Sequence, residues 1–462
     1  MQTVLEWAQL NFGTCELGDK RRTLRLVQVA ADLANNPSAS LPNQIEKWGD
    51  LKAAYRLFDQ EKVTFEAIVG PHWESTKKLA KGRTLVIGDT TEIDFGRFRK
   101  IEGIGPTGNG SGQGFLLHNA LMVNAESEEI LGIAGQTIHY RKQKSKTTKR
   151  PSILKRLEKK DRESLVWTKV ITQIGAPAEG NSFVHIFDRG ADNFEIYCHL
   201  LQQKGDWVIR AAQMQRLVHG EDSEKTMHLK KYLTQLQLLG DYTLALRARP
   251  GQPARDAKLE VRVGQIKIPQ PCHVSPWVRK LKPGPITMNV IDVVEVNSPT
   301  DVEPIRWVLL TSLPVGTFDD AGTAIHFYEL RWLVEEFHKA LKTGCSTESR
   351  QLKTAARLEA FVGLTSVTAI RLLQLKSLAR TDPERPAQRV IPNAWLKMLK
   401  LARKDLNRIH DLTVRQFYRE VAKLGGFLGR KSDGEPGWIT IWRGWEKLNM
   451  YVFIASRLKH ES

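Results

Sequence analysis

The sequence is poor in cysteine, and the cysteines it has form no recognisable motif. There are four among 462 residues, at Cys15, Cys198, Cys272 and Cys345. No two are spaced as a C-x-x-C pair, and none has histidine partners at zinc-finger spacing. This pattern argues against a disulfide framework or a structural zinc site, and we expect four reduced residues that serve in packing.

Long apolar stretches are also missing. We find no run of about 18 apolar residues, the length needed to cross a bilayer, and no signal peptide at the N-terminus. We therefore expect a cytoplasmic protein without a membrane partner.

Acidic residues are too few to balance the basic ones. Asp and Glu number 51 against 69 Lys and Arg, which gives a formal net charge of +18 and a pI of about 9.7. Because 41% of the residues are hydrophobic, the chain is expected to fold rather than remain a disordered cationic segment. Its length suggests roughly two to four domains, and its charge favours nucleic acid as the partner.

The pattern of apolar residues divides the chain into five segments. Helical periodicity dominates the N-terminus, and from Thr84 short apolar runs such as TLVIGD and FLLHNALMVN predict the strands of a mixed sheet. Strong alternation between turn residues then predicts an all-β insertion, after which helical periodicity returns. The predicted segments are a helical domain at 1–65, a core at 66–235, an all-β insertion at 236–304, a second part of the core at 305–352 and a helical domain at 353–462.

Residues 141–160 are unusually basic, with ten Lys or Arg and one acid. Such a density suits phosphate contacts or an untethered basic segment. We interpret it as a contact to target or flanking DNA.

One predicted helix near residue 330 has an unusual polar side. Tyr328, Arg331, Glu335 and Lys342 fall within an arc of roughly 60° at 100° per residue, while apolar residues such as Phe337 project from the opposite side. The helix is expected to bury that apolar side and to offer a hydroxyl, a carboxylate and two cations to solvent.

Two aspartates follow apolar strands. Asp89 comes after LVIG and Asp188 after FVHIF, and each is therefore predicted at the end of a strand. Together with Glu335 they would supply hard oxygen ligands for two Mg²⁺ ions, with Mn²⁺ as a substitute, about 4 Å apart in a phosphodiester-cleaving site. Glu336 is the alternative third ligand, but it lies about 100° away from Glu335 on the helix.

These motifs carry a resemblance to a known family. GDTT at 88–91, FDRGAD at 187–192 and the pattern Tyr-x2-Arg-x3-Glu-x6-Lys at 328–342 resemble DDE transposases of the insertion sequence 4 type, in particular the branch of transposon five. The resemblance covers nearly the whole chain. It implies an α/β fold with a ribonuclease H-like mixed-sheet core interrupted by the all-β insertion. It also implies that the helical N-terminal domain binds transposon ends and that the helical C-terminal domain dimerises.

The resemblance also implies roles for single residues. Asp89, Asp188 and Glu335 would be the catalytic, metal-binding triad. The phosphates near the cut would be held by Tyr328, Arg331, Lys342 and Arg210. Trp307 would stack on a flipped base, and the transposon ends would be bound by Arg21, Arg22, Arg25 and Arg56. Gly190 departs from the family pattern, because close relatives often carry an acid there.

The resemblance implies cut-and-paste transposition by a homodimer on double-stranded DNA, both transposon ends and target. A nick at each end would be followed by a hairpin intermediate and by joining of the 3′-hydroxyl to target DNA. Two alternatives are a Mg²⁺-dependent structure-specific nuclease without strand transfer and a DNA-binding regulator. The three acidic residues argue against the regulator.

Overall fold

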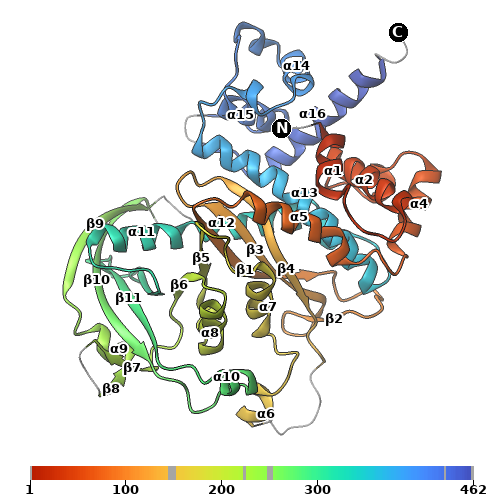
Figure 1. Ribbon diagram of the computed structural model, residues 1–462. Coiled ribbons are helices and arrows are strands. Elements are labelled where there is room, and N and C mark those ends of the chain that lie inside the picture. The colour runs from red at the N-terminus through yellow and green to blue at the C-terminus, as the bar shows by residue number, and fades with distance from the viewer. Residues whose placement is uncertain (1–2, 144–151, 222–224, 247–252, 431–432, 459–462) are drawn as a thin grey trace.

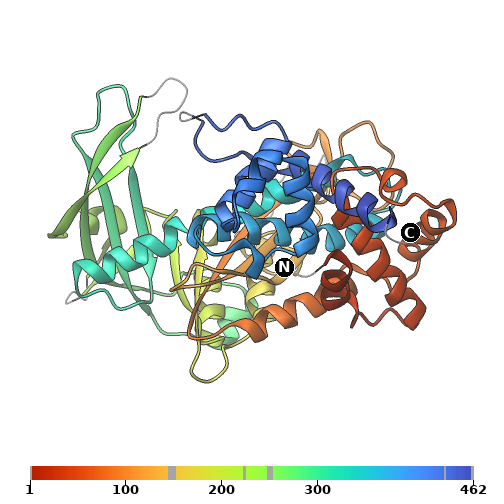
Figure 2. The same cartoon turned by 90° about the horizontal axis from the view of Figure 1, so that it is seen from above.

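A computed structural model of the chain describes residues 3–143, 152–221, 225–246, 253–430 and 433–458. A twelve-stranded mixed sheet runs through the centre of these residues, and helices cover both of its faces (Figure 1). Viewed from above, the N-terminal helices and the strands of residues 238–296 lie at opposite ends of the molecule (Figure 2).

The N-terminal residues form helices, as their periodicity predicts. Asp19 caps the second helix, since its side chain accepts a hydrogen bond of 2.8 Å from the backbone N–H of Arg21. The apolar sides of these helices are buried against one another. The helices are α1 (Val4–Phe12), α2 (Lys20–Asn35), α3 (Leu41–Gln44), α4 (Trp48–Phe58) and α5 (Phe65–Leu79).

The central strands have the order β4-β3-β1-β5-β6. β1, β3 and β4 pair antiparallel, while β5 and β6 run parallel to β1. This mixed arrangement is consistent with the ribonuclease H-like core that the sequence resemblance implies. The strands are β1 (Arg83–Asp94), β2 (Gly105–Thr107), β3 (Gly112–Asn124), β4 (Ile130–His139), β5 (Ser182–Phe187) and β6 (Asp206–Arg210).

Alternation along the strands decides which face each side chain occupies. In β1, Leu85 and Ile87 belong to the large apolar cluster shared with the N- and C-terminal helices, whereas Val86 belongs to a smaller cluster with α7 on the other face. Helices α7 (Leu165–Ile174) and α8 (Phe194–Gln202) cover that second face. The first face is covered by α5, α11 (Phe318–Glu329), α12 (Trp332–Lys339) and α13 (Ala355–Thr381).

The strands predicted as an insertion extend the same sheet. β12 (Arg306–Thr311) pairs with β6 on one side and with β11 on the other, so hydrogen bonding is continuous from the core into the added strands. The other elements here are β7 (Leu217–Gly220), β8 (Thr226–His228), α9 (Leu229–Leu233), β9 (Leu238–Leu246), β10 (Arg255–Ile268), α10 (Pro276–Leu281) and β11 (Ile286–Val296).

The segment 236–304 is not purely β. Ser275 caps α10 and Pro276 occupies its first turn, a combination that starts a helix inside the predicted insertion. The prediction of an all-β segment missed this start signal because it followed the alternation on either side.

Part of the basic segment 141–160 is described. It includes α6 (Ile153–Leu157), and Arg141 forms ion pairs with Glu92 and Glu163. Residues 144–151 lie outside the described residues, so the proposed DNA contact of this segment stays a prediction.

The C-terminal residues return to helices. One of them, α13, is long and apolar enough to cross a membrane by length and composition, although the sequence showed no obvious apolar run. Of its most apolar window, 89% is buried inside the structure, as expected of a core helix. The remaining helices are α14 (Asn393–Ala402), α15 (Val414–Leu424) and α16 (Trp438–Leu458).

Candidate active site

Asp89 and Asp188 lie next to each other. Asp188 directly follows β5, as predicted, whereas β1 continues past Asp89 to Asp94, so the predicted strand end at Asp89 is wrong. Gly88 of β1 is the register partner of Phe187 of β5, and each aspartate is the following residue. Parallel strands lie about 4.8 Å apart, and alternation puts Asp89 on the face of Leu85 and Ile87. α12 packs against β1 on that same face, so both aspartates are placed beside the helix of Glu335.

The predicted single helix at 328–342 is broken into three parts. α11 ends at Glu329, α12 begins at Trp332, and residues Ala340–Gly344 form a π-helix, η2. Backbone bonds from Arg331 to Tyr328 and from Leu333 to Leu330 span only three residues at the first junction. Neither Gly nor Pro marks this junction, so the sequence pattern could not reveal it.

Arg331 joins two members of the acidic triad. Its guanidinium donates to the Asp89 carboxylate at 3.1 Å and to the Glu335 carboxylate at 2.5 Å. Both carboxylates are mostly buried, as is the Arg331 side chain. A planar guanidinium suits this double contact. The site therefore brings β1 and α12 together through one cation.

The electrostatics of Asp89 differ from those of an ordinary surface aspartate. Burial is the main cause that raises the pKa of Asp89 to about 6, and the negative charges of Asp188 and Glu335 raise it further. The positive charge of Arg331 opposes this rise. Asp188 and Glu335 thus both act electrostatically on Asp89. Crowding of negative charge is expected where a site is built for a cation.

Tyr328, Arg210 and Trp307 form a second cluster beside the acids. Arg210 at the end of β6 lies close enough to the Tyr328 hydroxyl to act on its pKa, and the Tyr328 and Trp307 rings lie 6.2 Å apart. Tyr328 is buried, which corrects the expectation of a solvent-facing hydroxyl. Burial raises its pKa, although Arg331 and Arg210 oppose the rise. Three residues, from β6, β12 and α11, therefore lie close together here.

Lys342 lies in η2 and is half-buried. It forms an ion pair of 3.1 Å with Glu348, whose carboxylate also accepts the backbone N–H of Asp94 at the end of β1. The lysine is thus held near the end of β1 rather than in direct contact with the triad.

Two functional residues escaped the sequence reasoning. Asn119 of β3 is the register partner of Asp89, and its side-chain amide lies 3.0 Å from the imidazole of His338, one turn after Glu335. Both side chains are buried. They fix α12 to the sheet directly beneath the acids. Their pairing is tertiary, so no local spacing could have indicated it.

Gly190 has no room for the acidic side chain that its position suggests. A Cβ atom there would lie 2.9 Å from the Trp167 ring and 3.1 Å from the Asp188 carboxylate. Trp167 of α7 thus fills the space next to the second aspartate, which accounts for the departure from the family pattern.

The predicted end-binding arginines lie on the N-terminal helices. Arg21 and Arg56 are exposed, while Arg22 donates to the Leu17 carbonyl and Arg25 pairs with Asp50 at 2.6 Å. They belong to α2 and α4, which lie away from β1 and α12 (Figure 1).

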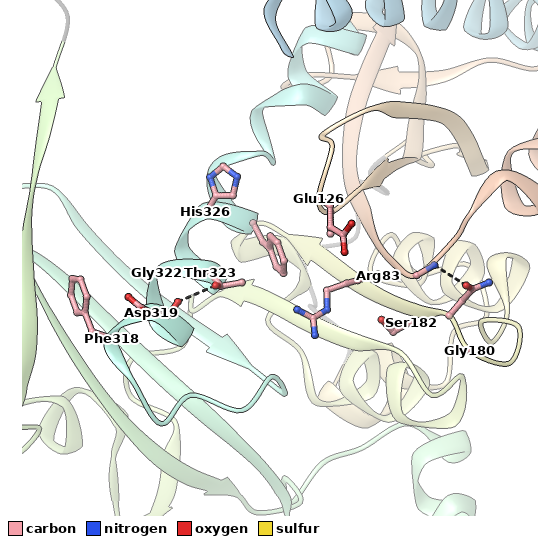
Figure 3. Close-up of a pocket in the computed structure, with 13 residues that line it drawn as sticks. Arg83, Glu126, Gly180, Ser182, Phe318, Asp319, Gly322, Thr323 and His326 are labelled. Carbon is pink, nitrogen blue, oxygen red and sulfur yellow. Dashed lines mark hydrogen bonds between the residues drawn. The ribbon is translucent and has the colours of Figure 1, made fainter. Parts of the chain in front are cut away.

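A cavity of about 860 Å³ lies at the N-terminal ends of the central strands β1 and β5. It is lined by the first residues of β1 and β5, including Arg83 and Ser182, and by α11 residues Asp319 and His326 (Figure 3). The cavity is therefore separate from Asp89 and Asp188, which lie beyond the other end of the β1–β5 pairing.

The acidic residues fit a divalent metal. Within the described residues, no three acidic, His or Cys side chains already stand in metal-binding positions, since Arg331 lies between Asp89 and Glu335. The guanidinium shows that one cation can contact both carboxylates. Asp188 lies alongside, and hard carboxylate oxygens are the donors that Mg²⁺ prefers.

Comparison with protein families identifies the chain. Residues 5–63 match a family model described as transposase DNA-binding, residues 82–371 match the transposase DDE domain, and residues 367–461 match the transposase Tn5 dimerisation domain. Domains of the DDE type act on DNA with divalent metal ions, generally Mg²⁺. The first and third matches support DNA binding and homodimer formation. Because the DDE match alone spans more than half of the sequence, this chain belongs to the DDE transposases and is an enzyme of the Tn5-like kind.

Proposed function

We propose that the protein is a cut-and-paste transposase that cleaves transposon ends through a hairpin and joins their 3′-hydroxyls to target DNA. The observation that supports this most is the convergence of Asp89, Asp188 and Glu335 from two strands and a helix that lie far apart in the sequence. A cation-binding centre beside a cluster of phosphate-binding side chains suits phosphodiester chemistry.

Asp89, Asp188 and Glu335 are the proposed ligands of two Mg²⁺ ions, with Mn²⁺ as a substitute. Bound there, the metal would activate the attacking oxygen and neutralise charge on the leaving oxygen. Arg331 would then leave at least one carboxylate and become available to a DNA phosphate.

The neighbouring side chains are proposed to hold the strand that is cut. Arg210 and Arg331 would contact phosphates, and the Tyr328 hydroxyl lies between their charges. Lys342 lies about two helical turns beyond Glu335, in η2, where an adjacent phosphate could replace Glu348 as its partner.

Trp307 is proposed to receive the flipped base. Its ring is half-buried on β12 and borders Tyr328, so it lies beside the proposed cleavage centre. Stacking a base on this ring would relieve the strain of a tight DNA hairpin.

The regions at the two ends of the chain have proposed roles as well. Residues 1–65 would bind the inverted repeats, chiefly through Arg21, Arg22, Arg25 and Arg56, and residues 353–462 would pair two subunits. The core would comprise 66–235 and 305–352, separated by the strand-rich segment 236–304. The protein would act on genomic DNA in the bacterial cytoplasm.

The test is a cleavage assay on labelled transposon ends identified from inverted repeats that flank the gene. With Mg²⁺, purified protein should produce a nick, then a hairpin, then strand-transfer products with target plasmid. Cleavage without any joining would instead support a structure-specific nuclease and overturn the proposed transposition.

A further inference from the structure

We propose that Glu336 is a positioning residue that fastens the Glu335 helix to α16, so that the packing of α16 decides where Glu335 lies. This inference rests on the proposed role of Glu335 in cleavage. It concerns a carboxylate that the active site does not use.

Glu336 points away from the acidic triad. Its carboxylate pairs with Lys376 of α13 and accepts a 2.7 Å hydrogen bond from the indole N–H of Trp438, the first residue of α16. The ammonium of Lys376 also lies 4.5 Å from the Trp438 ring centroid. One carboxylate thus ties α12 to two C-terminal helices.

The environment of Glu336 favours its charged form. Burial alone would raise its pKa, but hydrogen bonds from Lys376 and Trp438 lower it below the ordinary value. Its side chain is only 14% exposed. A buried, fully partnered carboxylate resists displacement, because moving it would leave a charge without partners.

A second contact fixes the other end of the same segment. Trp442, one turn along α16, lies against Gly344, the last residue of η2, where a Cβ atom would overlap its ring at 1.8 Å. The Trp438 and Trp442 rings are stacked with centroids 6.2 Å apart. Both ends of the stretch that carries Glu335 and Lys342 therefore rest on one edge of α16.

These contacts link two functional parts of the chain. Trp438, Trp442 and Lys376 lie within the match to the dimerisation domain, whereas Glu336 lies within the match to the DDE domain. Displacement of α16 would release one side of α12, while the Asn119–His338 contact holds only the opposite side. Glu335 would then sample positions unsuited to catalysis.

The experiment compares full-length wild-type protein with Glu336→Gln, Trp438→Phe and the double variant. Trp438→Phe keeps the ring but removes the N–H donor. Glu420→Gln is the matched control, since Glu420 of α15 is also buried and paired with two cations, Arg403 and Lys423, but does not contact α12.

The first readout is hydrogen–deuterium exchange. Amides of residues 332–344 should exchange about tenfold faster in Glu336→Gln and less so in Trp438→Phe, with little change in the central strands. Faster exchange throughout the molecule, or a local change of the same size in Glu420→Gln, would show that Glu336 contributes only to overall stability and would overturn the proposal.

The second readout is single-turnover cleavage of pre-bound transposon ends. Glu336→Gln should cleave roughly tenfold more slowly with unchanged end binding and should need more Mn²⁺ for half-maximal rate. The double variant should be no slower than Glu336→Gln, because both changes break one contact. Additive losses would overturn the proposal. If wild-type protein cleaves nothing, the proposed function is wrong, and the exchange measurement still decides whether α16 holds α12.

Discussion

Glu335 and Glu336 are adjacent on α12 but have opposite electrostatic surroundings. On one side Glu335 and Asp89 share the guanidinium of Arg331, and the charge of Asp188 lies close enough to act on Asp89. On the other side Glu336 has Lys376, Lys339 and the Trp438 indole for itself. The pKa of Asp89 is raised to about 6, whereas the pKa of Glu336 is lowered.

If Glu335 binds metal and Glu336 anchors α12, as proposed, then chemistry and anchoring are separated within one turn of helix. A side with excess negative charge is unfavourable for folding and is ready to take up cations. A side with satisfied charge holds the helix in place.

The largest effect is expected at the catalytic side. Glu335→Gln should lower the cleavage rate by at least about 1000-fold, because the amide is a poor metal ligand. End binding should remain, since the N-terminal arginines and the phosphate contacts are unchanged. Gel-shift and cleavage assays on the same preparation provide the measurement. Efficient cleavage by this variant would remove Glu335 from the triad.

Trp307→Ala should affect one step more than another. Nicking of the first strand should survive, while hairpin formation or opening falls about 10- to 100-fold, because a flipped base loses its stacking partner. Denaturing gels separate nicked from hairpin products.

Trp277→Ala provides a matched control for this variant. Trp277 stacks on His199 with ring centroids 3.8 Å apart, in α10 rather than beside the acids. It should lower stability without changing the ratio of nicked to hairpin product. Equal loss of both steps in Trp307→Ala would mean that this ring is structural.

Much of the catalytic side could be predicted from sequence. The apolar run before Asp188 marks the end of β5 correctly, whereas β1 continues past Asp89 to Asp94. Parallel pairing of the two strands still places the aspartates together. Helical spacing separated Glu335 from Glu336 correctly, since the two residues point to different neighbours. These inferences worked because they depend on local periodicity and on the edge of one sheet.

The anchoring side could not be predicted in this way. The pairs Glu336–Trp438 and Asn119–His338 join residues 102 and 219 positions apart, and no local spacing encodes such contacts. The break at Leu330–Arg331 also lacks a Gly or Pro signal. Tyr328 was expected at the surface for the same reason, because helical phase does not report what packs over a residue.

Lys342→Ala should weaken cleavage moderately, by about tenfold, since one phosphate contact is lost while the triad is retained. The slope of log affinity for transposon ends against log salt should fall by about one, given a slope near −0.9 per phosphate contact. Fluorescence anisotropy at several salt concentrations measures it. An unchanged slope would place Lys342 away from the DNA.

The smallest effect concerns stability and has opposite signs on the two sides of α12. The pKa of Asp89 is 3.8 in the unfolded chain and about 6 in the folded protein. Between pH 3.8 and about 6, the folded state therefore keeps a proton on Asp89 that the unfolded state has released. The contribution of Asp89 to the free energy of unfolding is therefore largest at low pH and is lost as the pH rises through about 6. Asp89→Asn should raise the free energy of unfolding at pH 7.5 by about 1 kcal/mol, after loss of the Arg331 contact, and the gain should shrink at pH 5.

Glu336→Gln should lower the free energy of unfolding at both pH values, because Lys376 loses a buried partner. Urea denaturation at the two pH values measures both signs. A destabilised Asp89→Asn would show that Arg331 fully compensates the crowded carboxylates, and the contrast between the two sides of α12 would then be one of geometry rather than of charge.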